Sequence, residues 1–210
     1  MGHPVFARVF AWLARSEGSL TTPFRRELLA GLHGDVLEVG AGAGSNFAHY
    51  PSGVERVVAV EPEPFLRARA AEAARDARVR IEVVPGRAEQ LPFADESFDA
   101  AVVSYVLCSV DDPVAAVAEI RRVLKTGGEL RFWEHVRATD PRLARVQRLL
   151  GPMWRRVNGG CRLTRDTEAT LAAAGLEVER CRAFRFRPCI LAAPVSPQIL
   201  GSARKRTLSA

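Results

Sequence analysis

The chain has 210 residues, which is enough for one domain with a substantial hydrophobic core. The balance of apolar and charged residues is that of an ordinary globular protein. The sequence contains no run of 18 apolar residues and no secretory signal, so we expect no transmembrane helix and a cytoplasmic protein.

The net charge of +6 comes almost entirely from arginine, and the basic residues become more frequent after Arg137. This asymmetry predicts a basic face in the C-terminal third. No basic patch interleaved with aromatic residues is found, so nucleic acid is not an expected partner. The four cysteines show no paired spacing, and the sequence therefore predicts neither a metal site nor a disulfide framework.

Residues 3–32 are predicted to be helical, with a break at 18–23. A new helix is predicted to begin at Thr22, because the proline that follows suits a first helical turn. Short β-branched strands then alternate with helices. The predicted strands are 35–40, 56–62, 80–86, 98–107 and 129–136, and the predicted helices are 45–50, 65–77 and 111–128, the last capped by Asp111 or Asp112 and stopped by Gly127.

The end of the chain is different in character. A basic amphipathic helix over 141–157, broken at Gly151 and Pro152, precedes a helix over 163–176 that Thr164 caps. Two closing strands are expected at 176–184 and 199–205.

This alternation predicts an α/β fold: a three-layer sandwich with a mostly parallel, seven-stranded Rossmann-like sheet and a helical lid inserted after strand five. We expect one domain over 1–210. Its parts are N-terminal helices (1–34), a cofactor-binding core (35–136), a basic lid and helix (137–167), and a C-terminal helix with strands (168–210).

The first strand runs into a glycine-rich loop from Glu38 to Gly44. A dinucleotide fingerprint needs a third glycine where this chain has Ser45, and Glu38 would repel a pyrophosphate. A cationic cofactor without phosphate fits better. Glu61 closes the next strand, where a carboxylate can accept both hydroxyls of a ribose. Together these residues favour S-adenosylmethionine as the cofactor.

Across 35–135 the chain resembles the class I S-adenosylmethionine-dependent methyltransferases, in the segments VLEVGAGAGSNF, VVAVEPEP, GRAEQLPFADESFDAAVVS and IRRVLKTGGEL. The resemblance implies that Glu61 holds the ribose and that the loop at 87–89 holds adenine. Arg87 departs from the aspartate usual in the family, and Glu89 or a backbone group is the alternative acceptor. The implied cofactor contacts are Glu38, Gly40, Ala41, Gly42, Asn46, Glu61, Pro62, Ala88, Glu89, Ser104 and Leu107.

The acceptor side is expected after strands four and five. The segments VLCSVDDP, WEHV and NGGCRLTRDT resemble the thiol S-methyltransferase branch of the methyltransferase-like proteins. That resemblance implies methyl transfer to a small apolar acceptor such as a thiol. Methylation of a lipid amine or a quinone, or cofactor binding without catalysis, are the alternatives.

His135 is the candidate general base, because neutral imidazole takes a proton near pH 7. The competing interpretation is a histidine that only bonds backbone at a strand end. Cys108 is interpreted as a small buried residue, and Asn158 and Cys161 as parts of the lid. The basic helix 142–156 is interpreted as a lid, with contact to a membrane surface as the alternative.

Overall fold

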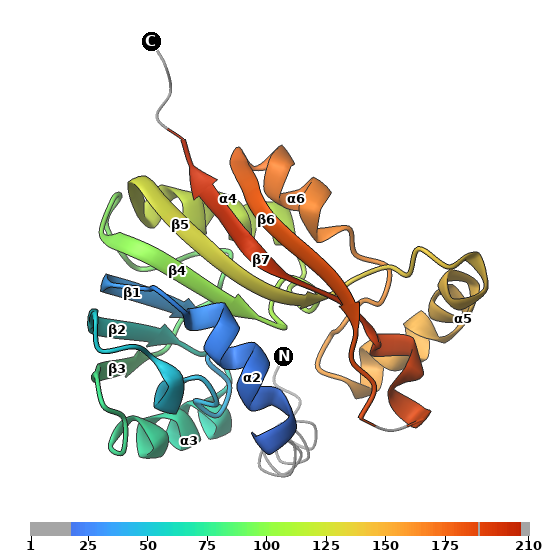
Figure 1. The fold of residues 1–210 in the computed structure, drawn as a ribbon, viewed down its shortest axis with the longest axis horizontal. Coiled ribbons are helices and arrows are strands. Elements are labelled where there is room, and N and C mark those ends of the chain that lie inside the picture. Colours follow the sequence, from blue (N-terminus) through green and yellow to red (C-terminus); the bar gives the residue numbers. More distant parts are fainter. Residues whose placement is uncertain (1–17, 189, 207–210) are drawn as a thin grey trace.

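The computed structural model describes residues 18–188 and 190–206. Its centre is a seven-stranded sheet with the strand order β3-β2-β1-β4-β5-β7-β6 (Figure 1). The first five strands are parallel, and β7 is antiparallel to both of its neighbours. The strands are β1 (Gly34–Val39), β2 (Val54–Val60), β3 (Arg80–Val84), β4 (Phe98–Ser104), β5 (Leu124–His135), β6 (Leu176–Arg185) and β7 (Pro197–Lys205).

The helices cover both faces of this sheet, which confirms the predicted three-layer α/β sandwich (Figure 1). Residues of α2 and α3 pack in one core, which includes Leu28, Leu29 and Ala70. Residues of α4 and α6 pack in the other, which includes Ile120 and Leu171. The helices are α2 (Gly18–Leu29), α3 (Pro64–Ala74), α4 (Pro113–Val123), α5 (Pro141–Val157) and α6 (Thr167–Ala173), with 3-10 turns η1 (Phe47–His49) and η2 (Ile190–Val195).

Two predicted helix breaks are wrong. Helix α2 runs through Pro23, and the part of the predicted N-terminal helix before residue 18 lies outside the described residues. Tertiary packing overrides the local signal, since Leu28 and Leu29 are buried and Phe24 stacks on Trp133 at 5.4 Å. Helix α5 likewise continues through Pro152, and Gln147 anchors it by accepting from Ala138 N and donating to the carbonyls of Val136 and Pro194.

Three further boundaries differ from the prediction. Segment 45–50 forms only the turn η1, because Pro51 biases Tyr50 to extended backbone. Helix α4, capped by Asp112, ends at Val123, and Gly127 lies inside β5, whose pairing with β4 shifts register near Phe98. Asp166 caps α6 in place of Thr164, since its carboxylate accepts from Ala169 N at 3.0 Å.

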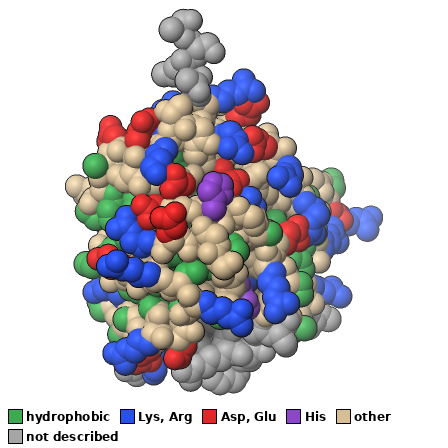
Figure 2. Space-filling model, turned by 60° about the vertical axis from the view of Figure 1, so that its left-hand side comes forward, with side chains coloured by type: hydrophobic (Ala, Val, Ile, Leu, Met, Phe, Trp, Pro, Cys, Tyr) green, Lys and Arg blue, Asp and Glu red, His purple; other side chains and the backbone are tan. Residues whose placement is uncertain are grey.

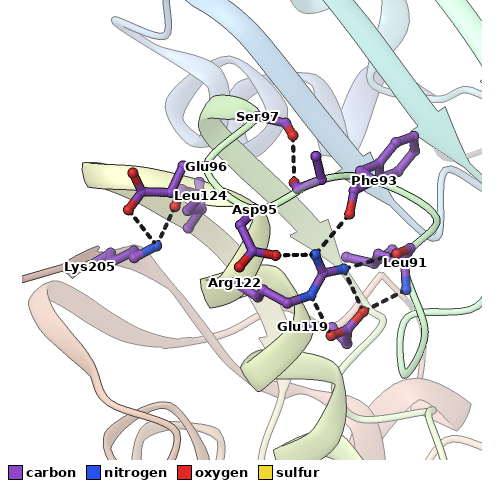
Figure 3. A network of polar contacts seen from close by, with 10 residues as sticks. Leu91, Phe93, Asp95, Glu96, Ser97, Glu119, Arg122, Leu124 and Lys205 are labelled. Carbon is purple, nitrogen blue, oxygen red and sulfur yellow. Dashed lines mark hydrogen bonds and ion pairs between the residues drawn. The ribbon is translucent and has the colours of Figure 1, made fainter.

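Arg122 on α4 fixes the long connection between β3 and β4 (Figure 3). Its guanidinium donates to the carbonyls of Leu91 and Phe93 and pairs with Asp95 and Glu119 at 2.7 Å. These contacts hold the connection against the sheet, and they raise the pKa of Arg122 above its ordinary value. The fixed part of the connection, 91–95, directly follows the loop at 86–90.

The surface is mixed in charge. On the face in Figure 2, Lys and Arg side chains are interspersed with Asp and Glu, so this face carries no continuous basic patch. Within the described residues, no helix combines the length and the apolar character that crossing a bilayer requires. Helix α5 projects beyond the body of the sheet (Figure 1).

Candidate cofactor and acceptor site

The loops that follow the parallel strands meet at one edge of the sheet. Strand β1 pairs with β2 on one side and with β4 on the other. Strands β2 and β3 therefore extend the sheet to one side of β1, and β4 and β5 extend it to the other. Such a switch point opens a crevice at the carboxyl ends of the strands, where α/β proteins bind their ligands. The predicted site residues belong to these loops.

The glycine loop depends on its glycines for two physical reasons. Gly40, Gly42 and Gly44 all have positive φ, at 70°, 58° and 80°. A Cβ atom on Gly40 would stand 2.5 Å from Val106 Cγ2, on the loop after β4. The glycines therefore allow both the turn itself and the close approach of its neighbour.

Glu38 lies at the base of this loop and is buried, with 3% of its surface exposed. Its carboxylate accepts from Asn46 Nδ2 at 2.9 Å and from Tyr50 OH at 2.6 Å. Arg25 of α2 donates to Asn46 Oδ1 at 2.7 Å and so joins the chain of contacts. Burial raises the pKa of Glu38 to about 7, although its hydrogen-bond partners oppose the shift. A buried carboxyl with so little counter-charge fits a cationic ligand, since a cation would favour its ionised form.

Glu61 joins two loops of the site. Its carboxylate accepts from Gly42 N at 2.8 Å and from Glu63 N at 2.9 Å, which connects the glycine loop to the turn after β2. Each carboxylate oxygen has two acceptor positions, so acceptor capacity remains on both oxygens. Burial raises the pKa of Glu61, and the backbone donors partly offset that effect.

The loop after β3 offers a second free acceptor. Glu89 Oε1 is buried and has no hydrogen-bond partner among the described residues, while Glu89 Oε2 lies 3.5 Å from Arg87 Nε. Arg87 itself is largely exposed, and Ala88 is buried beside it. An orphaned buried carboxylate oxygen fits a ligand amino group that donates to it.

The remaining predicted cofactor contacts lie in different surroundings. Ser104 Oγ, at the end of β4, is buried and without a partner among the described residues. The Leu107 side chain packs in the core, and the Leu107 amide donates to Glu134. Neither group is therefore free to contact the cofactor. Pro62 is exposed at the turn before α3, and Ala41 is buried in the glycine loop.

The residues present fit S-adenosylmethionine. A buried acid at Glu38 suits its cationic amino acid end, Glu61 suits ribose hydroxyls, and Glu89 suits the adenine amino group. All three residues are acids at the edge of the crevice. Glu38 offers a negative charge, and Glu61 and Glu89 offer hydrogen-bond acceptors. A phosphate-bearing cofactor would face three acids there.

The predicted acceptor side contains the buried carboxylate of Glu134 in β5. It accepts from three successive amides of the loop after β4, namely Val106 N, Leu107 N and Cys108 N, at 2.9 to 3.0 Å. Burial raises the pKa of Glu134, and these backbone donors lower it. Glu134 therefore fixes a hydrogen-bond network between β5 and the loop after β4.

His135 lies beside two cysteines. Its Nδ1 is 3.7 Å from Cys108 Sγ and 3.7 Å from Cys161 Sγ, and its ring stacks on Tyr105 with centroids 4.3 Å apart. Cys108 and Cys161 are buried, as expected for Cys108. Hydrogen bonding between the thiols raises the pKa of Cys108 and lowers that of Cys161, which His135 also lowers.

Arg25 and Tyr50 have no signal in the sequence, and the role of Cys161 has only a local one. Tyr50 reaches Glu38, and Arg25 reaches Asn46, only because the turn after η1 and helix α2 pack against the glycine loop. Cys161 reaches His135 only because the segment after α5 returns to the sheet. The local signal for Cys161 is the sequence NGGC at 158–161, in which Gly160 has a positive φ.

Comparisons with known proteins agree with this geometry. The profile of the family described as Methyltransferase domain matches residues 37–132. Thiol S-methyltransferase TMT1B of Homo sapiens is 39% identical over 184 residues, which cover 84% of this chain and 74% of that protein. Demethylmenaquinone methyltransferase of Thermobifida fusca (strain YX) is 38% identical over 100 residues, which cover 47% of this chain and 42% of that protein.

The fold has the same relatives. The crystal structure of YcgJ from Bacillus subtilis matches with a TM-score of 0.71 at 20% identity, over 90% of this chain and 99% of that one. The chain therefore belongs to the class I S-adenosylmethionine-dependent methyltransferases, and S-adenosylmethionine is its cofactor. Within that class, the thiol S-methyltransferases are similar to it over most of its length.

The pKa of Glu38 predicts a pH-dependent stability. The folded value of about 7 lies above the ordinary 4.5, so the carboxyl favours the fold at low pH, and this contribution is lost as the pH rises from about 4.5 through 7. We expect Glu38→Gln without cofactor to be more stable than the wild type by about 3 kcal/mol at pH 8.5 and equally stable below pH 4.

Urea denaturation at several pH values measures this difference. Glu55→Gln, at an exposed position on β2, is the matched control and should leave the profile unchanged. A stability difference between Glu38→Gln and the wild type that does not vary with pH would contradict the assignment.

Proposed function

We propose that this protein methylates a small thiol at sulfur, with His135 and its two neighbouring cysteines on the acceptor side. The observation that carries the proposal is the extent of similarity. The thiol S-methyltransferase TMT1B matches 84% of the chain, whereas the quinone methyltransferase matches 47%. Because the match to TMT1B spans 184 residues, it includes residues outside the family profile at 37–132.

Methyl transfer from S-adenosylmethionine to a thiol has few requirements. S-adenosylmethionine supplies a methyl group bonded to a sulfonium. The acceptor sulfur must lose its proton, be aligned with that methyl group, and be shielded from water. A thiol with a pKa near 8.5 is already partly ionised at neutral pH. Because the Nδ1 of His135 faces two sulfurs, a general-base role for His135 would use its Nε2.

The cofactor contacts belong to the same proposal. We assign the ribose to Glu61, the adenine amino group to Glu89, and the amino acid end to Glu38, with Asn46 orienting Glu38. The glycines at 40 and 42, together with Ala41, Pro62, Ala88 and Ser104, form the walls of the proposed cofactor site, and Leu107 packs behind them in the core. The reduced cysteines among the described residues suit a reducing compartment such as the cytoplasm.

Substituting Glu61 tests the ribose assignment. Glu61→Gln exchanges one acceptor oxygen for a donor, and we expect about tenfold weaker binding of S-adenosylhomocysteine by calorimetry. The wild type should also prefer that ligand over its 2′-deoxyribose analogue, and the variant should lose this preference. A variant that binds both more weakly but keeps the preference would show that Glu61 acts only through the loops.

An acceptor comparison tests the reaction. We expect turnover with a small alkyl thiol and none with a quinol or with phosphatidylethanolamine vesicles, measured as methyl transfer from labelled cofactor. Turnover of the quinol or the lipid amine alone would overturn the thiol assignment. Cofactor binding without turnover of any of the three would indicate a binding protein that has lost catalysis.

Helix α5 supports a second role at a membrane surface. Leu143, Leu150 and Trp154 are half-buried, but four apolar side chains on another side of the helix are exposed, and arginines flank them. This exposed stripe consists of Val146, Leu149, Met153 and Val157. An apolar stripe beside basic residues is the pattern of helices that lie in the interface of an anionic bilayer.

Vesicle sedimentation tests this role. We expect the protein to pellet with vesicles that contain phosphatidylserine and to remain in solution with phosphatidylcholine alone. The double variant Leu149→Glu and Met153→Glu should lose at least tenfold in binding, whereas Val114→Glu, at an exposed position on α4, should not. Equal binding by the double variant and the control would refute contact through α5.

A further inference from the structure

Three side chains with metal-ligating atoms converge beside the proposed acceptor site. Cys108 follows β4, His135 ends β5, and Cys161 follows α5, so the fold assembles them from separate segments. Cys108 Sγ, Cys161 Sγ and His135 Nδ1 all lie within 4.8 Å of one another. Among the described residues, no other three His, Cys, Asp or Glu side chains meet in this way.

The spacing matches tetrahedral zinc. Zinc lies about 2.3 Å from thiolate sulfur and about 2.0–2.1 Å from imidazole nitrogen, so a tetrahedral angle places sulfur and nitrogen about 3.6 Å apart. Both sulfurs of the cluster lie 3.7 Å from His135 Nδ1. A single ion can therefore be bound with little movement of these side chains. Soft thiolate ligands together with imidazole are the set that zinc prefers.

The surrounding structure holds each ligand in position. The Cys108 amide donates to Glu134 Oε2 at 3.0 Å, and its carbonyl accepts from Arg162 N at 2.7 Å. The Arg162 contact also fixes Cys161, the preceding residue, whose own amide donates to the Asn158 carbonyl at 3.0 Å. The His135 ring is stacked on Tyr105 at 20°. Ligands held by backbone and packing in this way are typical of metal sites.

The turn before Cys161 is constrained as well. Gly160 has a φ of 89°, and a Cβ atom there would stand 2.8 Å from the Ser109 carbonyl oxygen. This close approach brings the segment after α5 onto the loop after β4, and so brings Cys161 to Cys108. A Cβ atom at position 160 would therefore require one of these two segments to shift.

We propose that Cys108 Sγ, Cys161 Sγ and His135 Nδ1 bind one zinc ion and leave its fourth position open for a small ligand. Three protein ligands with an open fourth position are the arrangement of catalytic zinc, whereas structural zinc has four protein ligands. In this arrangement His135 is a ligand and not a general base. The part of the proposal that concerns the acceptor rests on the proposed thiol methylation.

The open position suits a thiol acceptor. A thiol bound there gives up its proton to solvent, because a coordinated thiol is deprotonated. One lone pair of the thiolate sulfur then forms the bond to the methyl carbon. The bond between that carbon and the sulfonium sulfur breaks, and its electron pair stays on the former sulfonium as a thioether. No oxidant or reductant is needed, and the neutral thioether product binds zinc less strongly than the thiolate.

Metal titration of the full chain, kept reduced, tests the site. We expect one zinc per chain by elemental analysis, and cobalt(II) added alone should give the visible absorption of a tetrahedral thiolate complex. Cys108→Ser and Cys161→Ser should each weaken binding at least tenfold, and His135→Gln should do the same. Cys181→Ser, an exposed cysteine outside the cluster, is the matched control and should bind like the wild type.

Zinc should also raise the melting temperature of the wild type and of Cys181→Ser, but not of Cys161→Ser. If Cys108→Ser does not fold, Cys161→Ser and His135→Gln carry the test. Metal binding that is equal in all variants would overturn the proposal. So would a Cys108–Cys161 disulfide, found by alkylation and mass spectrometry, in protein prepared under reducing conditions.

Turnover separates the two proposals. Thiol methylation that is lost with chelator and restored by zinc would support both. Equal methylation by the metal-free and the zinc-loaded protein would refute the zinc site and leave thiol methylation standing. Stoichiometric zinc binding without thiol turnover would refute the proposed function and leave the metal site standing.

Discussion

The buried carboxylate of Glu134 fixes the loop after β4, where we place the acceptor. A carboxylate without water is stable only when hydrogen bonds replace the lost hydration, and here three successive amides from the loop after β4 do so. The same contacts force that loop to curl over the end of β5. They set Cys108 next to His135, and they bring Val106 close enough to the glycine loop that only glycine fits at position 40.

Two other buried acids act in a similar way on the cofactor side. Glu38 is bonded by Asn46 and Tyr50, and Glu61 by the amides of Gly42 and Glu63. Each acid closes a loop at the carboxyl edge of the sheet, at a cost in desolvation that its donors offset only in part. Because of this remaining desolvation cost, a cationic ligand fits the crevice: a positive charge near Glu38 would stabilise the ionised carboxylate that burial destabilises.

The proposed cofactor half and acceptor half of the crevice differ in which parts of the chain form them. The cofactor half comes mostly from consecutive segments of the chain between β1 and β4, which lie side by side in the sheet. The acceptor half combines β4, β5 and the segment after α5, which the antiparallel pair β6 and β7 and the anchor at Gln147 hold in place.

Much of the fold and of the cofactor half was predictable from the sequence. The alternation of β-branched strands with helices gave the α/β sandwich and its seven strands, and the glycine spacing with the flanking acids Glu38 and Glu61 indicated the cofactor. Those signals are local: periodicity, turn chemistry and charge within a few residues. The same local rules failed at Pro23 and Pro152, where buried Leu28 and Leu29 and the anchored Gln147 outweigh the helix-breaking tendency of proline.

What the sequence by itself determined is therefore the class of protein, its cofactor and the residues of the glycine loop. Only the tertiary structure decided that Arg25 and Tyr50 reach the glycine loop, that Glu134 bonds three amides, and that Cys161 meets Cys108 and His135. Cys108 and Cys161 lie 53 residues apart, and this separation matches no short metal-binding motif. They come together because strand order and a close turn at Gly160 bring distant segments to one edge of the sheet.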